Sequence, residues 1–263
     1  MPKSATRTLD LIEYLASAGT SVTHTELSKV LDIPKSSLSA LIKSLMARGY
    51  VVVDQADRYR IGPRVLVLAN GFLDTADVVS FAQPILARIA QTVDESAALA
   101  LIEGTKALVV AHAPSKRIVQ RSLSLGGQGP LSTTSAGKVL LAFCENSEEV
   151  IDGLELIQTA RNSILDRDVL RKEIEEIRRS FVAYSREESI DGMIGISMPV
   201  WDSIGAVVAS INVAIPAHRF TPAHEVEVQK ALRSGAADIT ASLGGQVPPG
   251  FLMPSSTSDL EHG

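Results

Sequence analysis

The chain has 263 residues, 45% of them hydrophobic and 21% charged, so it can bury the core of one large domain or of two smaller ones. The formal net charge of −5 argues against a protein that binds polyanions indiscriminately. The charge is divided unevenly: residues 1–62 hold eight Lys or Arg and six Asp or Glu, a net charge of +2, which leaves −7 for the other 201 residues. We therefore expect two domains, of which the N-terminal one is the more basic.

Cysteine content and hydropathy indicate the compartment. Cys144 is the only cysteine, which excludes a disulfide framework within the chain and a cysteine-rich zinc site. The first residues, MPKSATRTLDLIEYL, lack the apolar centre of a signal peptide, and no apolar run approaches the roughly 18 residues that a membrane helix needs. We expect a cytoplasmic protein that has no membrane partner.

Residues 1–63 have the pattern of three helices followed by a hairpin. Apolar residues recur at helical spacing from Leu9 to Ala16, and Thr23 with Glu26 forms a capping-box pattern for a short second helix. A third helix begins near Pro34, which suits a first helical turn, and ends at Gly49. The run YVVVDQADRYRIG then alternates as two strands around a polar turn. This order predicts a winged helix-turn-helix domain.

The third helix carries the candidate DNA-binding surface. Its outer face is rich in Lys and Ser near the helix N-terminus, where main-chain N–H groups and the helix dipole favour phosphate. Two arginines of the hairpin share one face and add candidate phosphate contacts. A solvated helix face that binds nothing is the alternative for such a pattern. The candidate residues are Lys35, Ser36, Ser37, Ser39, Lys43, Arg58 and Arg60.

The rest of the chain predicts a linker helix over residues 64–77, a second domain over 78–245 and a disordered, Pro- and Ser-rich tail over 246–263. Helices and antiparallel strands alternate too irregularly for a doubly wound parallel sheet, so the class is α+β. Strands are expected at 96–103, 106–114, 118–125, 193–201 and 205–215, and helices at 78–93, 134–143, 166–181 and 221–243.

No catalytic, metal or cofactor motif is found. The five histidines lack the spacing of a zinc site, and the sequence SAGKV around Lys138 lacks the first glycine of a phosphate loop, because that position is Ser132. The acids Glu187, Glu188 and Asp191 stand among polar residues and are expected to be exposed. Ser197, Ser210 and Asn212 interrupt apolar strands, where they either bond internally or line a small ligand cavity.

From about Thr6 to Gly245 the chain resembles bacterial transcription regulators of the isocitrate lyase regulator (IclR) family. The segments RTLDLIEYLA, TELSKVLDIPKSSLSALIKSLMARGYV and RYRIGPRVLVLA follow the family's order and spacing, as do PLSTTSAGKVLLAF, DGMIGISMPVWD and VASINVAIP further on. The resemblance implies a winged helix domain, a linker helix and a C-terminal effector-binding domain with a GAF-like fold. It also implies a homodimer or homotetramer and a small effector molecule that changes the affinity for double-stranded operator DNA. We expect no cofactor.

The resemblance also assigns candidate effector contacts. Many members carry an arginine in the recognition helix where this chain has Ala40, so we expect a different operator. Family positions that often hold an aspartate, a cysteine and serines correspond to uncharged residues here, which implies a roomier, less acidic pocket for a larger or partly aromatic effector. The candidates are Ser185, Gly195, Asn212 and Ala214, together with Ser135, Ala136 and Gly137 of the STTSAG loop, whose N–H groups suit an anionic ligand.

The sequence thus predicts a DNA-binding regulator, a repressor rather than an activator, and not an enzyme. Two other readings remain at this point. A hydrolase with a helical extension would need a nucleophile and a base brought together, and the sequence has no motif for them. A protein-interaction module would use the helix-turn-helix as a docking surface only.

Overall fold

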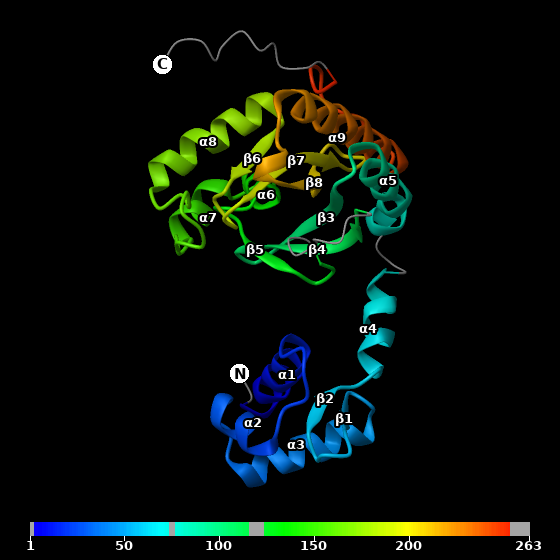
Figure 1. Ribbon diagram of the computed structural model, residues 1–263, viewed down its shortest axis with the longest axis vertical. Coiled ribbons are helices and arrows are strands. Elements are labelled where there is room, and N and C mark those ends of the chain that lie inside the picture. The colour runs from blue at the N-terminus through cyan, green and yellow to red at the C-terminus, as the bar shows by residue number, and fades with distance from the viewer. Residues whose placement is uncertain (1–2, 74–76, 116–123, 253–263) are drawn as a thin grey trace. The chain divides into compact units, whose positions relative to one another are not determined.

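A computed structural model describes residues 3–73, 77–115 and 124–252 (Figure 1). The chain divides into two compact units, Met1–Ala76 and Asp77–Gly263, each with its own hydrophobic core. Sequence patterning predicted two domains of this kind.

The N-terminal unit is a winged helix-turn-helix. Thr23 caps the second helix as predicted: its hydroxyl accepts a hydrogen bond from the Glu26 N–H, and Glu26 accepts one from the Thr23 N–H at 2.8 Å. Leu27, Leu38 and Ile42 are buried where the three helices meet. The elements are α1 (Lys3–Ser17), α2 (His24–Val30), α3 (Lys35–Ala47), β1 (Val51–Val53), β2 (Tyr59–Ile61) and α4 (Arg64–Leu73).

The C-terminal unit is built on a six-stranded antiparallel sheet in the order β5-β4-β3-β8-β7-β6. Strands from the middle of the chain therefore lie beside strands from its end, because β3 pairs with β8. The strands are β3 (Ser96–Glu103), β4 (Lys106–Ala113), β5 (Gln128–Pro130), β6 (Ala183–Arg186), β7 (Met193–Trp201) and β8 (Val207–Pro216).

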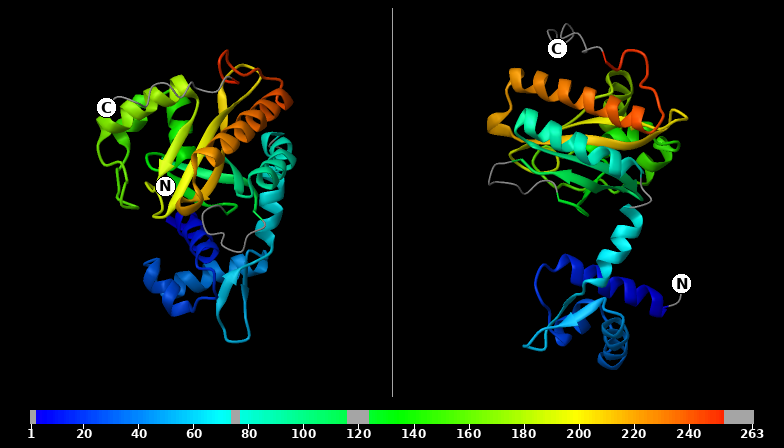
Figure 2. Two further views of the ribbon diagram at one scale, coloured as in Figure 1. Left: turned by 45° about the horizontal axis from the view of Figure 1, so that its top comes forward. Right: turned by 90° about the vertical axis from the view of Figure 1, so that its right-hand side faces the viewer.

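Helices cover both faces of this sheet (Figure 2). On one face α5 (Asp77–Val93) and α9 (Pro222–Ser242) pack together, and Gly235 of α9 lies so close to Ile89 of α5 that an added Cβ would stand 2.5 Å from it. On the other face lie α6 (Ser135–Phe143), α7 (Ser147–Gly153) and α8 (Arg167–Ser180). Helix α6 is the most enclosed of these, since every residue from Ser135 to Ala142 is buried.

Three short elements differ from the sequence prediction. Strand β5, helix α7 and strand β6 were not predicted, because each has at most seven residues and a polar or Gly/Pro-containing sequence that lacks a clear period. Of the strand predicted at 118–125, residues 118–123 lie outside the described part, and Ser124 and Leu125 are not in a strand. The long strands and helices predicted for the second domain are confirmed.

The prediction of a disordered tail is wrong for residues 246–252. Phe251 is fully buried, with its ring edge-on to Trp201 at 4.9 Å between ring centroids and to Phe181 at 5.8 Å. The guanidinium of Arg233 on α9 donates a hydrogen bond to the Phe251 carbonyl. Burial of one aromatic side chain thus orders a segment whose Pro and Gly content is typical of disorder. The remainder of the predicted tail, 253–263, lies outside the described residues.

Candidate functional site: an effector pocket and a DNA-binding face

The C-terminal unit contains a cavity of about 310 Å³ between the first turn of α6, one face of the sheet and the turn that joins β6 to β7. Apolar side chains alternate there with hydroxyl and amide groups. The described residues that line the cavity include no Asp, Glu, Lys or Arg, and they are Ala100, Ala107, Val109, Ser124, Gly127, Gln128, Gly129, Thr134, Ser135, Ala136, Ser185, Ser189, Ile190, Met193, Ile194, Gly195, Asn212 and Ala214.

Six of the seven predicted effector contacts lie on this cavity: Ser135, Ala136, Ser185, Gly195, Asn212 and Ala214. Gly137 does not. Its N–H is donated to the hydroxyl of Thr134 at 3.0 Å, and an added Cβ would lie 2.6 Å from the Cα of Leu131. This glycine lets α6 pack against the preceding loop, so the prediction that its N–H serves a ligand needs correction.

The start of α6 brings backbone and hydroxyl groups to the cavity. Thr134 caps the helix, and its own hydroxyl donates to the Pro130 carbonyl at 2.8 Å, which holds the loop before the helix. The next two residues, Ser135 and Ala136, occupy the first turn, where N–H groups are not used by the helix itself. The positive end of the helix dipole therefore lies at the cavity wall.

Two hydroxyl contacts join α6 to the sheet. Ser197 of β7 donates to Ser135 at 2.7 Å, and Ser185 of β6 donates to the Thr133 carbonyl at 2.7 Å. Gly195 makes the first contact possible, because a Cβ there would lie 2.6 Å from the Ser135 Oγ. Of the two readings of the polar strand residues, internal bonding describes Ser197, and Ser210 donates to the Met198 carbonyl at 3.5 Å.

Asn212 of β8 differs from these serines. Its side chain is buried on the cavity wall, and its Oδ1 has no hydrogen-bond partner among the described residues. A buried polar atom without a partner is costly unless water or a ligand supplies the missing contact. Because Oδ1 is an acceptor, the missing partner is an N–H or O–H group.

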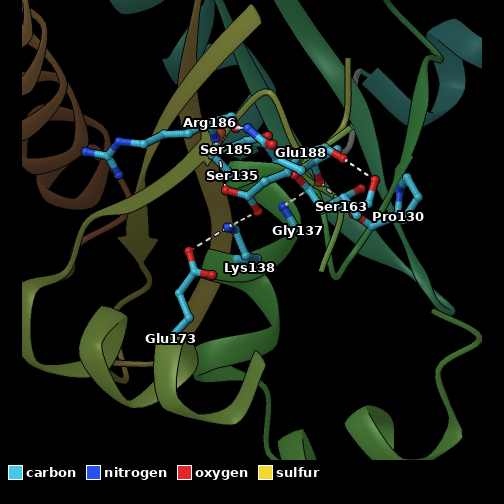
Figure 3. A network of polar contacts seen from close by, with 12 residues as sticks. Pro130, Ser135, Gly137, Lys138, Ser163, Glu173, Ser185, Arg186 and Glu188 are labelled. Atoms are coloured by element: carbon cyan, nitrogen blue, oxygen red, sulfur yellow. Dashed lines mark hydrogen bonds and ion pairs between the residues drawn. The ribbon is translucent and has the colours of Figure 1, made fainter. Parts of the chain in front are cut away.

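A buried ion-pair cluster that the sequence did not predict joins α6 to α8 and to the turn after β6 (Figure 3). The ammonium of Lys138 on α6 is fully buried and donates to Glu173 Oε1 and Glu188 Oε2, both at 2.5 Å. We call Lys138, Glu173 and Glu188 the Lys138 cluster. The prediction that Glu188 is exposed is wrong: it is 8% exposed. Burial raises the pKa of the Glu188 carboxyl above its ordinary value, and the neighbouring Lys138 ammonium opposes this change in pKa.

The outer face of α3 contains four of the five predicted helix contacts, since Lys35, Ser36, Ser39 and Lys43 are exposed. Ser37 is half-buried. The Ser39 hydroxyl donates to the Lys35 carbonyl at 2.9 Å and lies 3.0 Å from His24 Nε2, which links this face to α2. No acidic residue lies within α3.

The two arginines of the hairpin differ. The guanidinium of Arg58 donates from Nε and Nη2 to the Ser21 carbonyl, at 3.0 and 2.7 Å, and lies 3.9 Å from Glu26. Arg58 therefore ties the hairpin to the loop before α2, and the prediction of a phosphate contact there needs correction. Arg60 is exposed on β2, where no such bond occupies it in the described residues.

Family models match both units. The IclR helix-turn-helix domain matches residues 4–55, and the C-terminal domain of the bacterial transcriptional regulator IclR matches residues 70–241. The chain belongs to the IclR family of bacterial transcriptional regulators. As an IclR-family protein it is a DNA-binding regulator, and the unit that holds the cavity is its effector-binding domain.

Individual relatives agree over most of this IclR-family chain. It is 29% identical to the HTH-type transcriptional repressor AllR of Klebsiella pneumoniae over 242 residues, which cover 90% of this chain and 89% of that one. A putative transcriptional regulator from Rhodococcus sp. RHA1 has a similar structure, with a TM-score of 0.82 at 25% identity over 92% of this chain and 98% of that one. An IclR homolog from Microbacterium hydrocarbonoxydans, solved in complex with 4-hydroxybenzoate, has a TM-score of 0.78 at 21% identity over 91% and 98%.

Two further features of this IclR-family protein concern metals and membranes. Across the described ranges no group of three or more His, Cys, Asp or Glu side chains is arranged to hold a metal ion. No helix in the same part of the chain is long and apolar enough to cross a membrane.

Proposed function

We propose that this IclR-family regulator is a repressor that binds operator DNA as a homo-oligomer and is controlled by a small organic acid held in the cavity of its C-terminal unit. The unpartnered Oδ1 of Asn212 on the wall of that cavity is the observation that carries the effector part of the proposal.

The cavity restricts the chemistry of the effector. Since no charged side chain lines it among the described residues, the N–H groups of Ser135 and Ala136 at the positive end of α6 are the groups suited to a carboxylate. Asn212 then requires a hydroxyl or amino group elsewhere on the same molecule. A volume of about 310 Å³ is near the lower limit for ligand pockets and suits a molecule with a single ring.

A hydroxy- or amino-substituted aromatic carboxylate meets these conditions. The 4-hydroxybenzoate named for the Microbacterium hydrocarbonoxydans homolog has a carboxylate at one end and a phenol at the other. We use it as a probe for this chain. Apolar contacts with Ile190, Met193 and Ile194 favour such a ring.

Control of DNA binding requires that the effector bind two states of the protein unequally. A ligand with equal affinity for the DNA-binding and the released states would shift nothing. If the effector is an inducer, it must release the repressor from DNA. It then binds the released state more tightly than the DNA-binding state.

On the DNA side, we assign α3 to the major groove and Arg60 of the hairpin to the backbone. Lys35 and Lys43 are exposed on the same helix without an intervening acid, so both ammonium groups are free to neutralise phosphate. Ala40 is also exposed on α3, and its small side chain permits close approach of the duplex.

Assembly into homodimers is supported by the surface of α4. Leu66, Val67 and Leu68 are 69%, 54% and 58% exposed, an apolar stretch that costs free energy in water unless a partner covers it. A second copy of the same helix is a suitable partner, because a two-fold arrangement brings identical apolar residues together. A dimer of this kind predicts a palindromic operator.

The DNA part is tested by fluorescence anisotropy with the duplex upstream of the protein's own gene at two salt concentrations. We expect Lys35→Ala and Lys43→Ala each to weaken binding and to reduce the slope of log K against log salt by about 1. Equal affinity for the upstream duplex and for a scrambled one would refute sequence-specific regulation.

The effector part is tested with Asn212→Leu. We expect 4-hydroxybenzoate to release the wild-type protein from its operator and to have no effect on Asn212→Leu, which should bind the same DNA with unchanged affinity. Leucine is close to asparagine in size but leaves a ligand hydroxyl unpaired. An unchanged response of the variant would locate the effector elsewhere.

A further inference from the structure

We propose that Lys138 positions one wall of the effector pocket through its contact with Glu188, so that effector affinity depends on a residue pair that no effector touches. This inference rests on the proposed function and concerns the same pocket. Neither Lys138 nor Glu188 is among the residues that line the cavity.

The contact joins two of the segments that line the cavity. Lys138 lies three residues after Ser135 and two after Ala136, and both of these residues line the cavity from α6. Glu188 directly precedes Ser189 and Ile190, which line it from the turn between β6 and β7. The 2.5 Å contact between Lys138 Nζ and Glu188 Oε2 therefore sets the separation of these two walls (Figure 3).

Glu188 is held by hydrogen bonds at both carboxylate oxygens and at its main-chain carbonyl. Its second carboxylate oxygen, Oε1, accepts from the Arg186 N–H at 2.9 Å. Its main-chain carbonyl accepts from the hydroxyls of Thr159 and Ser163, at 3.1 and 2.7 Å. Because both the main-chain carbonyl and the carboxylate of Glu188 are held, the next two residues, Ser189 and Ile190, have little freedom to move away from the cavity wall.

Glu173 also binds the Lys138 ammonium, but it does not position a cavity wall. It contacts Lys138 Nζ at the same distance of 2.5 Å, yet its side chain is 31% exposed. It belongs to α8, and no residue of α8 lines the cavity. Glu173 thus supplies charge to the buried lysine without contacting the wall, which makes it a matched control for Glu188.

The chemistry of the contact explains why glutamine cannot replace Glu188. Both carboxylate oxygens accept hydrogen bonds, one from an ammonium and one from a main-chain N–H. A glutamine has one acceptor oxygen and one NH₂ group, so in Glu188→Gln either Lys138 Nζ or the Arg186 N–H faces another donor. The lysine keeps Glu173 as a charged partner, so the variant is expected to fold.

The experiment compares full-length Glu188→Gln with full-length Glu173→Gln in two measurements. In hydrogen–deuterium exchange without ligand, we expect amides of residues 187–193 to exchange about tenfold faster in Glu188→Gln, as for the loss of one charged hydrogen bond. Amides of α9 serve as the internal reference and should be unchanged. Glu173→Gln should leave residues 187–193 within about twofold of wild type.

The second measurement is calorimetric titration with 4-hydroxybenzoate. We expect its dissociation constant to rise about tenfold in Glu188→Gln, as for one lost charged hydrogen bond, and to stay near the wild-type value in Glu173→Gln. A Lys138→Met background should abolish the difference made by Glu188→Gln, since the two residues act through one contact. A purely structural role would change the melting temperature in both glutamine variants and leave the dissociation constant alone.

The outcomes separate this proposal from the proposed function. If both glutamine variants exchange alike over residues 187–193, the Lys138 cluster stabilises the domain only and the inference is overturned. If wild-type protein does not bind 4-hydroxybenzoate, that effector class is wrong, and the exchange measurement still decides whether Glu188 positions the wall.

Discussion

Gly195 of β7 lies directly against Ser135 at the start of α6, so close that a Cβ at residue 195 would stand 2.6 Å from the Ser135 Oγ and 3.4 Å from the Ser185 Cβ. The absence of a side chain at Gly195 thus determines where one wall of the proposed effector pocket lies. A methyl group there would displace Ser135 and break the 2.7 Å hydrogen bond from Ser197.

We therefore expect Gly195→Ala to weaken effector binding by about tenfold, because overpacking at a rigid contact costs roughly 1–3 kcal/mol. Operator affinity without effector should be unchanged, since residue 195 belongs to the C-terminal unit. Calorimetric titration with 4-hydroxybenzoate measures the first effect and anisotropy the second. Gly153→Ala is the control, because an added Cβ there meets nothing within 4 Å.

The two arginines of the hairpin should separate stability from DNA binding. Arg58→Ala removes two hydrogen bonds to the Ser21 carbonyl and is expected to lower the free energy of unfolding by about 1 kcal/mol, a value reduced because the guanidinium is partly exposed. Arg60→Ala should change that free energy by less than about 0.5 kcal/mol and weaken operator binding.

Urea unfolding and anisotropy on both variants test this pair. The salt slope of operator binding should fall by about 1 in Arg60→Ala and remain at the wild-type value in Arg58→Ala once the variant is folded. If the salt slope falls in Arg58→Ala and stays at the wild-type value in Arg60→Ala, then Arg58, and not Arg60, contacts the DNA backbone.

The segment 246–252 is expected to stabilise the C-terminal unit, although its Pro and Gly content is typical of disorder. Phe251→Ala should lower the free energy of unfolding by about 3–5 kcal/mol, the usual cost of removing a fully buried phenylalanine. It also removes the ring whose centroid lies 5.5 Å from the guanidinium carbon of the buried Arg233. Leu252→Ala, at a side chain that is 60% exposed, should change the same free energy by less than about 0.5 kcal/mol. Equal effects in thermal unfolding would mean that the segment does not pack in solution.

His112 on β4 should make the protein sensitive to acid. Burial lowers the pKa of this imidazole below its ordinary value, and its Nε2 has no hydrogen-bond partner among the described residues. As pH falls through about 6.5 the unfolded chain gains a proton that the folded chain resists, so stability decreases. The free energy of unfolding measured in urea between pH 7.5 and 5 should fall more steeply in wild type than in His112→Gln. Parallel slopes would show that His112 titrates as it does in the unfolded chain.

The sequence predicted those features of the structure that depend on residues close together in the chain. The Thr23 and Glu26 capping box forms bonds within three residues and is found as predicted. The pairing of Asn212 with a ligand cavity was left open, because the same residue in an apolar strand can bond internally. The missing partner of the Asn212 Oδ1 favours the ligand cavity, and it is visible only once the sheet is packed.

Contacts between distant residues could not be predicted from pattern. Lys138 and Glu188 are 50 positions apart, and the charge of each is matched only when α6 and the turn after β6 pack together. Arg58 is likewise bound by a carbonyl 37 positions earlier. In both cases a charged side chain is typical of the protein surface. The partner that holds each one within the fold is too far away in the sequence to be found from residue spacing.

Trp201 is the only tryptophan of the chain, and it is almost fully buried against Phe181 and Phe251 in the C-terminal unit. Intrinsic tryptophan fluorescence therefore observes the effector domain alone, because the winged helix domain contains no indole. Its emission maximum should shift to longer wavelength when that domain unfolds and stay constant when only the DNA-binding domain does. The protein thus carries a label-free optical probe with which the unfolding of its two domains can be followed separately.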